Sequence, residues 1–284
     1  MLELHCHTTF SDGTLAPTEL VEAAAAAGVR ALAITDHDTL GGWDEAIAAA
    51  RRFGLTIVPG IELSTVWHGR SLHVLGFYPQ RDLLEPPLRD RFEGRRRRAR
   101  QMADKLAKLG YPIVLPQIGA GIAPGRPHIA RALVAAGHAR TEREAFDRWL
   151  SDGGPAYVSY EKFSAVEGIR LLRDCGAVPV WAHPFLFRGG EPSEILPELV
   201  AAGLRGIEIY HPTHTPTQHA MLAQLARTYN LVATGGSDYH GPIKDGPTLN
   251  QLQLPLELLT ALQAARLTNR GPASSSDRER SGLR

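Results

Sequence analysis

The sequence predicts an α/β barrel that carries a helical insertion. Short apolar segments alternate with amphipathic ones along residues 1–80 and again along residues 156–270. This alternation favours a parallel sheet with right-handed crossovers. The 284 residues suffice for one barrel of roughly 200–250 residues plus an insertion. Histidine and acidic residues follow most of the apolar segments, at the positions where a barrel gathers its functional loops.

About seven short strands are expected, at residues 2–5, 31–35, 56–61, 72–77, 178–182, 206–210 and 231–234. The helices between them are expected at residues 17–27, 43–53, 165–174, 193–202 and 217–229. Pro17 suits a helix start, while Gly28 and Gly54 suit the left-handed position that ends a helix. Three charged helices, at residues 89–109, 129–136 and 142–150, predict an inserted subdomain over residues 81–155. Residues 271–284 are rich in Ser and Arg and predict a disordered tail.

Composition excludes several classes of protein. The formal net charge of +1 gives no overall attraction to nucleic acid or membrane, and most of the 31 basic residues are arginine. Arginine suits phosphate recognition better than lysine does. No apolar stretch reaches the roughly 18 residues of a membrane span. Cys6 and Cys175 form no disulfide framework, and the N-terminus lacks a signal-peptide pattern, so a cytoplasmic protein is expected.

Candidate metal ligands follow the predicted strands. Taken singly, they have plain structural explanations: Asp12 could hold a turn, and His73 could be a satisfied core histidine. His5 and His7 point to one face of a strand, with Cys6 on the other. Clustered carboxylates repel one another, and clustered imidazoles lack partners, unless a cation lies among them. We therefore expect a multinuclear metal site formed by His5, His7, Asp12, His37, Glu62, His73, His183, Asp238 and His240.

Short motifs follow one another in a fixed order: His5-x-His7 with Ser11-Asp12-Gly13, Asp36-His37-Asp38, Gly60-Ile61-Glu62, His73, Ala182-His183-Pro184 and Ser237-Asp238-x-His240. Together they resemble the PHP (polymerase and histidinol phosphatase) family. The resemblance spans almost the whole chain and implies a distorted seven-stranded (β/α)7 TIM-like barrel that hydrolyses phosphate esters with divalent metals. In the insertion, the segment from Gly125 to Arg131 further resembles the branch of nucleoside 3′,5′-bisphosphate phosphatases and 5′-exoribonucleases.

The resemblance also implies how the ligands divide among three metals. The first would be held by His5, His7, Glu62 and Asp238, the second by Asp12, His37 and His240, and the third by Glu62, His73 and His183. Manganese is the metal expected, and zinc or iron is compatible with these donors. Closely spaced cations would lower the pKa of a shared water and give a hydroxide for attack on phosphorus. His211 ends a strand at the same rim and could assist the phosphate or the leaving oxygen, or be purely structural.

The arginine-rich insertion is expected to select the substrate. Arginines 95–98 and Arg100 would cover more than half the circumference of a helix, so some must be solvated. The candidate ligands of a second phosphate are Arg95, Arg98, Arg126, His128 and Arg131. A second phosphate site favours hydrolysis of the 3′-phosphate of a nucleoside 3′,5′-bisphosphate, such as the conversion of adenosine 3′,5′-bisphosphate to AMP.

Alternative functions remain open at this point. They are a 5′-to-3′ exonuclease acting on short 5′-phosphorylated oligonucleotides, a histidinol-phosphate-type phosphatase, a metallo-amidohydrolase and a non-catalytic binding module. No lysine ends a predicted strand, which disfavours an amidohydrolase site with a modified lysine as metal bridge. The intact ligand set disfavours a non-catalytic module. The expected partner is a nucleotide or short oligonucleotide, with no membrane and no stable protein partner.

Overall fold

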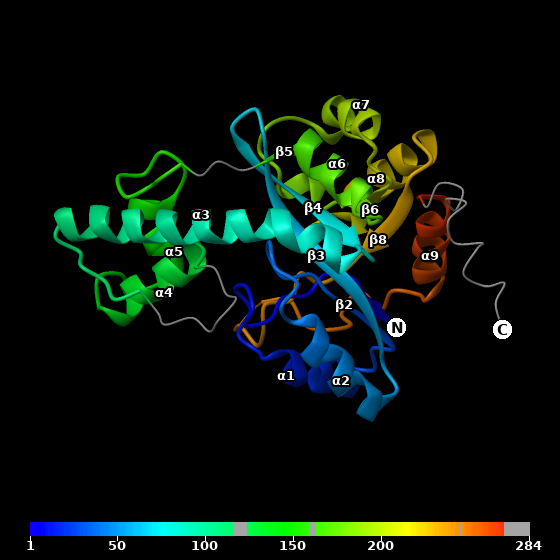
Figure 1. Ribbon diagram of the computed structural model, residues 1–284, viewed down its shortest axis with the longest axis horizontal. Coiled ribbons are helices and arrows are strands. Elements are labelled where there is room, and N and C mark those ends of the chain that lie inside the picture. The colour runs from blue at the N-terminus through cyan, green and yellow to red at the C-terminus, as the bar shows by residue number, and fades with distance from the viewer. Residues whose placement is uncertain (116–123, 160–162, 245, 270–284) are drawn as a thin grey trace, which may run out of the picture.

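The computed structural model describes residues 1–115, 124–159, 163–244 and 246–269, and it shows an α/β barrel surrounded by helices (Figure 1). In this part of the chain, seven strands follow one another around the sheet, and a further two-residue strand, β5 (Phe163–Ser164), pairs with β3. The predicted seven-stranded barrel is confirmed. In sheet order the strands are β1 (Leu2–Glu3), β2 (Ala31–Ile34), β3 (Thr56–Trp67), β4 (Arg70–Phe77), β6 (Val178–Trp181), β7 (Gly206–Tyr210) and β8 (Val232–Gly235).

The expectation of a parallel sheet is wrong at β4. This strand pairs antiparallel with both β3 and β6, whereas the other neighbours along the barrel are parallel. β3 and β4 are joined by a turn at His68 and Gly69, whose φ angles are 44° and 78°. Such a tight turn permits only an antiparallel hairpin. The hairpin pairing also extends β3 to Trp67, well beyond its predicted end.

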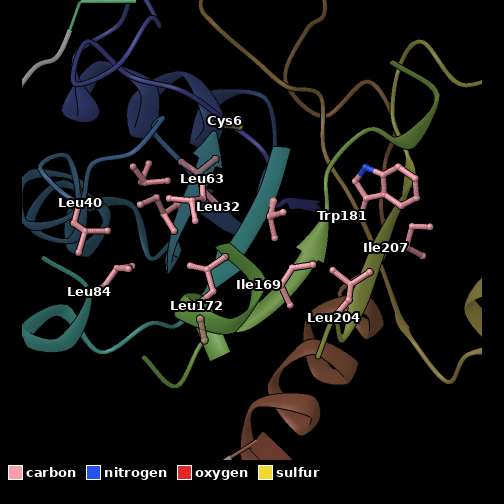
Figure 2. Packing of buried hydrophobic residues seen from close by; sticks show 14 of the residues in the cluster. Cys6, Leu32, Leu40, Leu63, Leu84, Ile169, Leu172, Trp181, Leu204 and Ile207 are labelled. Carbon is pink, nitrogen blue, oxygen red and sulfur yellow. The ribbon is translucent and has the colours of Figure 1, made fainter. Parts of the chain in front are cut away.

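The barrel comes close to closing where the segment after β8 meets the segment after β1. The backbone N–H of Leu4 donates to the oxygen of Gly235 at 3.2 Å, and that of His7 donates to the oxygen of Tyr239 at 2.9 Å. Buried apolar side chains pack on both faces of the strands in two clusters, of which Figure 2 shows part of the larger. Cys6 belongs to the larger cluster and is fully buried. The strands therefore form a firm base for the residues at their ends.

The helices around the barrel lie close to their predicted positions. They are α1 (Pro17–Ala26), α2 (Trp43–Phe53), α6 (Ala165–Asp174), α7 (Pro192–Ala202) and α8 (Pro216–Thr228). Gly28 and Gly54 have φ angles of 80° and 61°, as expected at helix ends. The side chains of Ser164 and Thr215 cap α6 and α8. A further helix that was not predicted, α9 (Glu257–Asn269), packs against β8 and β6.

Helix α3 (Arg81–Lys108) carries the chain away from the barrel (Figure 1). Its predicted start at residue 89 is wrong, because Pro86 and Pro87 lie inside the helix and not before it. A proline inside a helix removes a hydrogen bond and costs about 3 kcal/mol. The buried side chains of Leu84 and Leu88 belong to the barrel core and anchor this first part of α3. The packing of Leu84 and Leu88 against the barrel core therefore outweighs the cost of the two prolines inside the helix.

The rest of the insertion packs around the far half of α3. It contains α4 (Arg126–Ala135), α5 (Glu142–Ala145) and a π-helical segment, η1 (Phe146–Leu150). α4 begins before the predicted residue 129, because Pro127 suits its first turn. A separate apolar cluster holds these helices together and includes Met102, Leu106, Ile129, Leu133 and Trp149. The predicted tail, 271–284, lies outside the described residues, and within them no helix is long and apolar enough to cross a membrane.

Candidate metal centre

The nine candidate ligands predicted from the sequence come together at one rim of the barrel. Most follow the C-terminal end of a strand, as expected. His73 reaches the same rim from inside β4, because that strand runs in the opposite direction and pairs His73 with Ser64 of β3. The ligand atoms of eight of them form overlapping groups within 4.8 Å: His5, His7, Glu62 and Asp238; His7, Asp12, His37 and His240; and His37, Glu62 and His73. The ninth, His183, lies outside these groups, with its Nε2 3.0 Å from Oε1 of Glu62.

Glu62 lies at the centre of the cluster, with five imidazoles around one carboxylate. Its Oε1 lies 2.7 Å from His73 Nδ1 and 3.0 Å from His183 Nε2. Its Oε2 lies 3.1 Å from a ring nitrogen of each of two histidines and 3.3 Å from that of a third, which are His5, His7 and His37. Each oxygen thus faces a different group of ligands, as a carboxylate between two cations would require.

Asp12 organises the neighbouring group. Its Oδ1 lies 3.3 Å from His240 Nε2 and 3.7 Å from His7 Nδ1, and its Oδ2 lies 3.7 Å from His37 Nε2. His7 and His37 face Asp12 with one ring nitrogen and Glu62 with the other. The groups around Asp12 and Glu62 are therefore continuous.

The electrostatic environment of the cluster favours the binding of cations. Burial would raise the pKa of Glu62, Asp12 and Asp238, but the surrounding imidazoles hold all three well below their usual range. Burial would lower the pKa of His7, but Asp238 and Glu62 raise it to about 10. Burial lowers the pKa of His37 to about 3. The raised pKa of His7 favours a proton on this imidazole, and a metal ion would displace it.

The donor atoms fit a metal centre. Buried atoms without a hydrogen-bond partner include Nε2 of His7, Oδ1 of Asp12, Nδ1 of His37 and Oδ1 of Asp238. Each such atom costs about 1–3 kcal/mol when it is left unsatisfied. Divalent cations would satisfy them together, and imidazole with carboxylate is a donor set that manganese, zinc and iron all accept.

Glu208 is a part of the site that the sequence interpretation missed. It is fully buried in β7, and its Oε1 accepts a hydrogen bond from His5 Nδ1 at 3.0 Å. Its Oε2 accepts from the backbone N–H of His183 at 2.7 Å. A carboxylate on Nδ1 leaves Nε2 of His5 free to bind a metal. The available signal was an acidic residue between Ile207 and Ile209 in a predicted buried strand.

Asp36 supports the loop that carries Asp12. Its Oδ1 accepts hydrogen bonds from the backbone N–H of Thr8 at 2.8 Å and from the hydroxyl of Ser11 at 2.6 Å. Its Oδ2 accepts from the hydroxyl of Thr8 at 2.7 Å. Asp36 is buried, and it therefore fixes the position of Asp12 through the backbone.

Three residues of the rim have strained backbone conformations. Asp38, His183 and Asp238 all have positive φ angles, of 54°, 32° and 53°. Such conformations cost of order 1–3 kcal/mol each and cluster at functional sites. Glu3 helps to hold one of them, because it accepts a hydrogen bond at 2.8 Å from the backbone N–H of Ser237, next to Asp238.

His211 lies beside the ligand groups but is not part of them. Its Nδ1 lies 2.8 Å from the hydroxyl oxygen of Thr213. Its Nε2 lies 3.6 Å from Oδ2 of Asp238 and has no hydrogen-bond partner, and the residue is buried. His211 therefore contacts a candidate ligand with an unsatisfied ring nitrogen.

A cavity of about 320 Å³ lies between the barrel rim and the insertion. Seven candidate ligands line it, and so do three of the five candidate substrate-binding residues, Arg95, Arg98 and Arg126. The other arginines of the run, Arg96, Arg97 and Arg100, are exposed. Burial lowers the pKa of Arg98 to about 10, with a smaller contribution from Arg126. Positive charge is thus concentrated on one wall of a cavity whose other wall is acidic.

The remaining two candidates, His128 and Arg131, are not among the residues that line this cavity. Both terminal nitrogens of Arg131 lie 3.3 Å from the backbone oxygen of Asp12, so Arg131 ties α4 to the rim. His128 Nδ1 accepts a hydrogen bond from the backbone N–H of Gly125 at 3.2 Å and caps the start of α4.

The chain is similar to several known proteins. Residues 3–113 match the family model of the PHP domain. The chain is 37% identical over 247 residues to a 5′-3′ exoribonuclease of Haemophilus influenzae, covering 84% of this chain and 90% of the relative. It is 34% identical over 261 residues to a 3′,5′-nucleoside bisphosphate phosphatase of Chromobacterium violaceum, covering 86% of this chain and 89% of the relative.

Solved structures show the same relationship. A protein from Bifidobacterium adolescentis, described as a metal-dependent phosphoesterase, superposes with a TM-score of 0.81 at 32% identity over 93% of this chain and 96% of that chain. The matches cover the barrel and the insertion together, and the clustered imidazoles and carboxylates supply a site able to hold metal. The chain belongs to the PHP family of metal-dependent phosphoesterases.

Proposed function

We propose that the enzyme removes the 3′-phosphate of nucleoside 3′,5′-bisphosphates and converts adenosine 3′,5′-bisphosphate to AMP. The observation that carries this proposal is that candidate metal ligands and three arginines, Arg95, Arg98 and Arg126, line one cavity. Guanidinium groups bind phosphate by charge-assisted hydrogen bonds. A substrate with two phosphates uses both walls of the cavity at once. The name of the Chromobacterium violaceum relative supports the proposal.

We further propose three divalent ions per chain, with manganese as the native metal and zinc or iron as compatible substitutes. The three ligand sets are those implied by the family resemblance: His5, His7, Glu62 and Asp238; Asp12, His37 and His240; and Glu62, His73 and His183. When bound, the ions supply a hydroxide nucleophile and neutralise phosphate oxygens. The close approach of both Glu62 oxygens to imidazoles supports its role as the bridge.

The protein side chains hold the substrate for that attack. Arg98 and Arg126 would bind the 5′-phosphate, so that the distance between the two phosphates places the 3′-ester at the metals. Their own hydrogen bonds, to the oxygen of Val158 at 2.8 Å and to Asp152 at 2.7 Å, restrict their movement. His211, with its unsatisfied Nε2, is the candidate donor of a proton to the leaving 3′-oxygen.

A 5′-to-3′ exonuclease is the second candidate. The exposed Arg96, Arg97 and Arg100 continue the basic surface of α3 beyond the cavity, where an oligonucleotide backbone could follow it. The Haemophilus influenzae relative bears that name. Histidinol phosphate carries a single phosphate. The arginines that line the cavity therefore give no comparable support to the histidinol-phosphate alternative.

Hydrolysis by metal-loaded protein tests these proposals, measured as inorganic phosphate from the phosphate monoesters and as nucleoside 5′-monophosphate from the oligonucleotides. The substrates are adenosine 3′,5′-bisphosphate, AMP, histidinol phosphate and 5′-phosphorylated oligonucleotides, and metal content is measured on the same sample. We expect the highest kcat/KM with the bisphosphate. A clear preference for histidinol phosphate would refute the proposal, and a preference for oligonucleotides would select the second candidate.

The predicted division of the chain is part of the proposal. Residues 81–155 would form a cap that recognises substrate, while residues 1–80 and 156–270 would form the catalytic barrel. The separate apolar cluster of the insertion supports this division. A cytoplasmic location and the absence of a stable protein partner remain predictions from the sequence.

A further inference from the structure

The cavity contains apolar side chains that neither the metals nor the arginines explain. Among the described residues that line it, three have apolar side chains: Pro127 and Phe146 from the insertion and Leu186 from the barrel. Leu186 ends a short helix, η2 (Pro184–Leu186), which directly follows the candidate ligand His183, and its side chain is 42% exposed. The two phosphates of a bisphosphate would bind the metals and the arginines, and neither would have a use for these three apolar side chains as binding partners.

Phe146 owes its place to an irregular helix. It is the first residue of η1, where the N–H of Ser151 bonds to the oxygen of Phe146 at 3.0 Å, one residue further along than in an α-helix. Within this π-helical turn, Trp149 and Leu150 bury their side chains in the core of the insertion, while Phe146 packs against the same core and also lines the cavity. Single π-helical turns are uncommon and occur frequently at functional sites.

Phe146 also ends a row of alternating rings and guanidinium groups. The Arg126 guanidinium carbon lies 5.9 Å from the centre of the Phe146 ring and 5.8 Å from that of the Tyr157 ring. Arg98 lies 5.4 Å from the centre of the Tyr157 ring. Aromatic and guanidinium planes stack readily on nucleobases. Since Asp152 holds Arg126 at 2.7 Å, the row is a fixed surface that reaches the cavity at Phe146.

We propose that Phe146 and Leu186 form a nucleobase subsite, in which the base stacks on Phe146 and is covered from the barrel side by Leu186. This inference rests on the proposed function, because it assigns the part of the nucleotide that carries no phosphate. The three apolar side chains offer no hydrogen-bond donors or acceptors to the edge of a base. The subsite therefore selects by stacking area, with purines favoured over pyrimidines, and does not read base identity.

Substrates with and without a base test the subsite. For metal-loaded wild-type protein, we expect kcat/KM to be about 5- to 100-fold higher for adenosine 3′,5′-bisphosphate than for 1,2-dideoxyribose 3,5-bisphosphate, which has both phosphates but no base. Phe146→Ala should abolish most of this preference, mainly through KM on the nucleotide, and Leu186→Ala should reduce it. Phe146→Trp should restore it. Matched controls are Phe53→Ala and Leu83→Ala, at exposed apolar positions on other helices.

Failure of the nucleobase subsite and failure of the proposed function give different experimental results. Equal losses on both substrates in Phe146→Ala, at unchanged Tm and metal content, would overturn the subsite while leaving the phosphatase intact. If wild-type protein hydrolyses neither bisphosphate, the proposed function fails, and calorimetric titration with AMP and ribose 5-phosphate still decides on the subsite. Tighter binding of AMP that disappears in Phe146→Ala supports it. Equal binding of the two ligands, or no binding of either, overturns it.

Discussion

Arg95 Nη1 donates a hydrogen bond to Asp38 Oδ2 at 2.6 Å and lies 3.4 Å from the backbone oxygen of His37. Asp38 is buried, and its Oδ1 accepts a hydrogen bond from the backbone N–H of Ser64 at 2.8 Å. Burial would raise the pKa of Asp38, but Arg91 and Arg95 hold it below its usual range. The Asp38 carboxylate thus connects Arg95 of α3 to the backbone of β3 at Ser64, next to the candidate ligand His37. The position of Arg95 in the cavity depends on that connection.

Asp38→Asn should therefore weaken substrate binding more than metal binding. The amide keeps the acceptor for Ser64 but loses the charge that holds Arg95. We expect kcat/KM for adenosine 3′,5′-bisphosphate to fall about 10- to 100-fold, mainly through KM. Hydrolysis of p-nitrophenyl phosphate and metal content should change little. Asp44→Asn, which removes the exposed ion pair with Arg81, is the matched control. Equal losses on both substrates would contradict a positioning role.

Glu208→Gln tests the support of His5. Without the carboxylate, Nδ1 of His5 loses its charged acceptor, and the ring no longer presents Nε2 to a metal in a fixed tautomer. Loss of such a partner typically lowers metal affinity about 10- to 100-fold. Metal per chain, measured after dialysis against a graded chelator, should fall in this variant. It should stay at the wild-type value in Glu22→Gln, which alters an exposed carboxylate. Unchanged retention in Glu208→Gln would refute the assignment.

The rim was predictable from sequence because the candidate ligands lie in or shortly after predicted strands, and the strand ends of a barrel meet at one place. His73 lies beside the other candidate ligands, although the antiparallel direction of β4 was not predicted. Glu208 escaped because one acidic residue inside an apolar strand carries no motif. The contacts of Arg131 could not be predicted from the sequence, because they join α4 to the loop at Asp12 through tertiary packing alone.

Metal should stabilise the folded chain strongly. Each bound ion satisfies buried atoms that otherwise lack partners, and free metal at 100 times its Kd adds about 2.7 kcal/mol per site. For a chain of this size that corresponds to a rise in Tm of roughly 5–10 °C per site. Differential scanning fluorimetry with manganese and then with excess chelator measures the shift. Glu62→Gln should show a much smaller shift, and a wild-type Tm that is indifferent to metal would contradict the centre.

His128 makes the insertion sensitive to acid. Burial lowers the pKa of this imidazole to about 4, with a contribution from Arg131. Its neutral Nδ1 accepts the hydrogen bond that caps α4. Above the ordinary pKa of 6.5, both folded and unfolded chains are neutral here, so His128 adds no pH dependence. As the pH falls from 6.5 towards 4, the unfolded chain binds a proton that the folded chain rejects, and stability decreases.

His128→Asn should remove this component, because the amide oxygen can replace Nδ1 as acceptor and cannot be protonated. Between pH 7 and pH 4.5 we expect the Tm of wild-type protein to fall more steeply than that of the variant, by an amount equivalent to about 1–3 kcal/mol. His138→Asn, at a partly exposed histidine of the same insertion, should follow the wild-type slope. Parallel slopes for wild type and His128→Asn would show that His128 is not the acid-sensitive group, since all other histidines are shared by the two proteins.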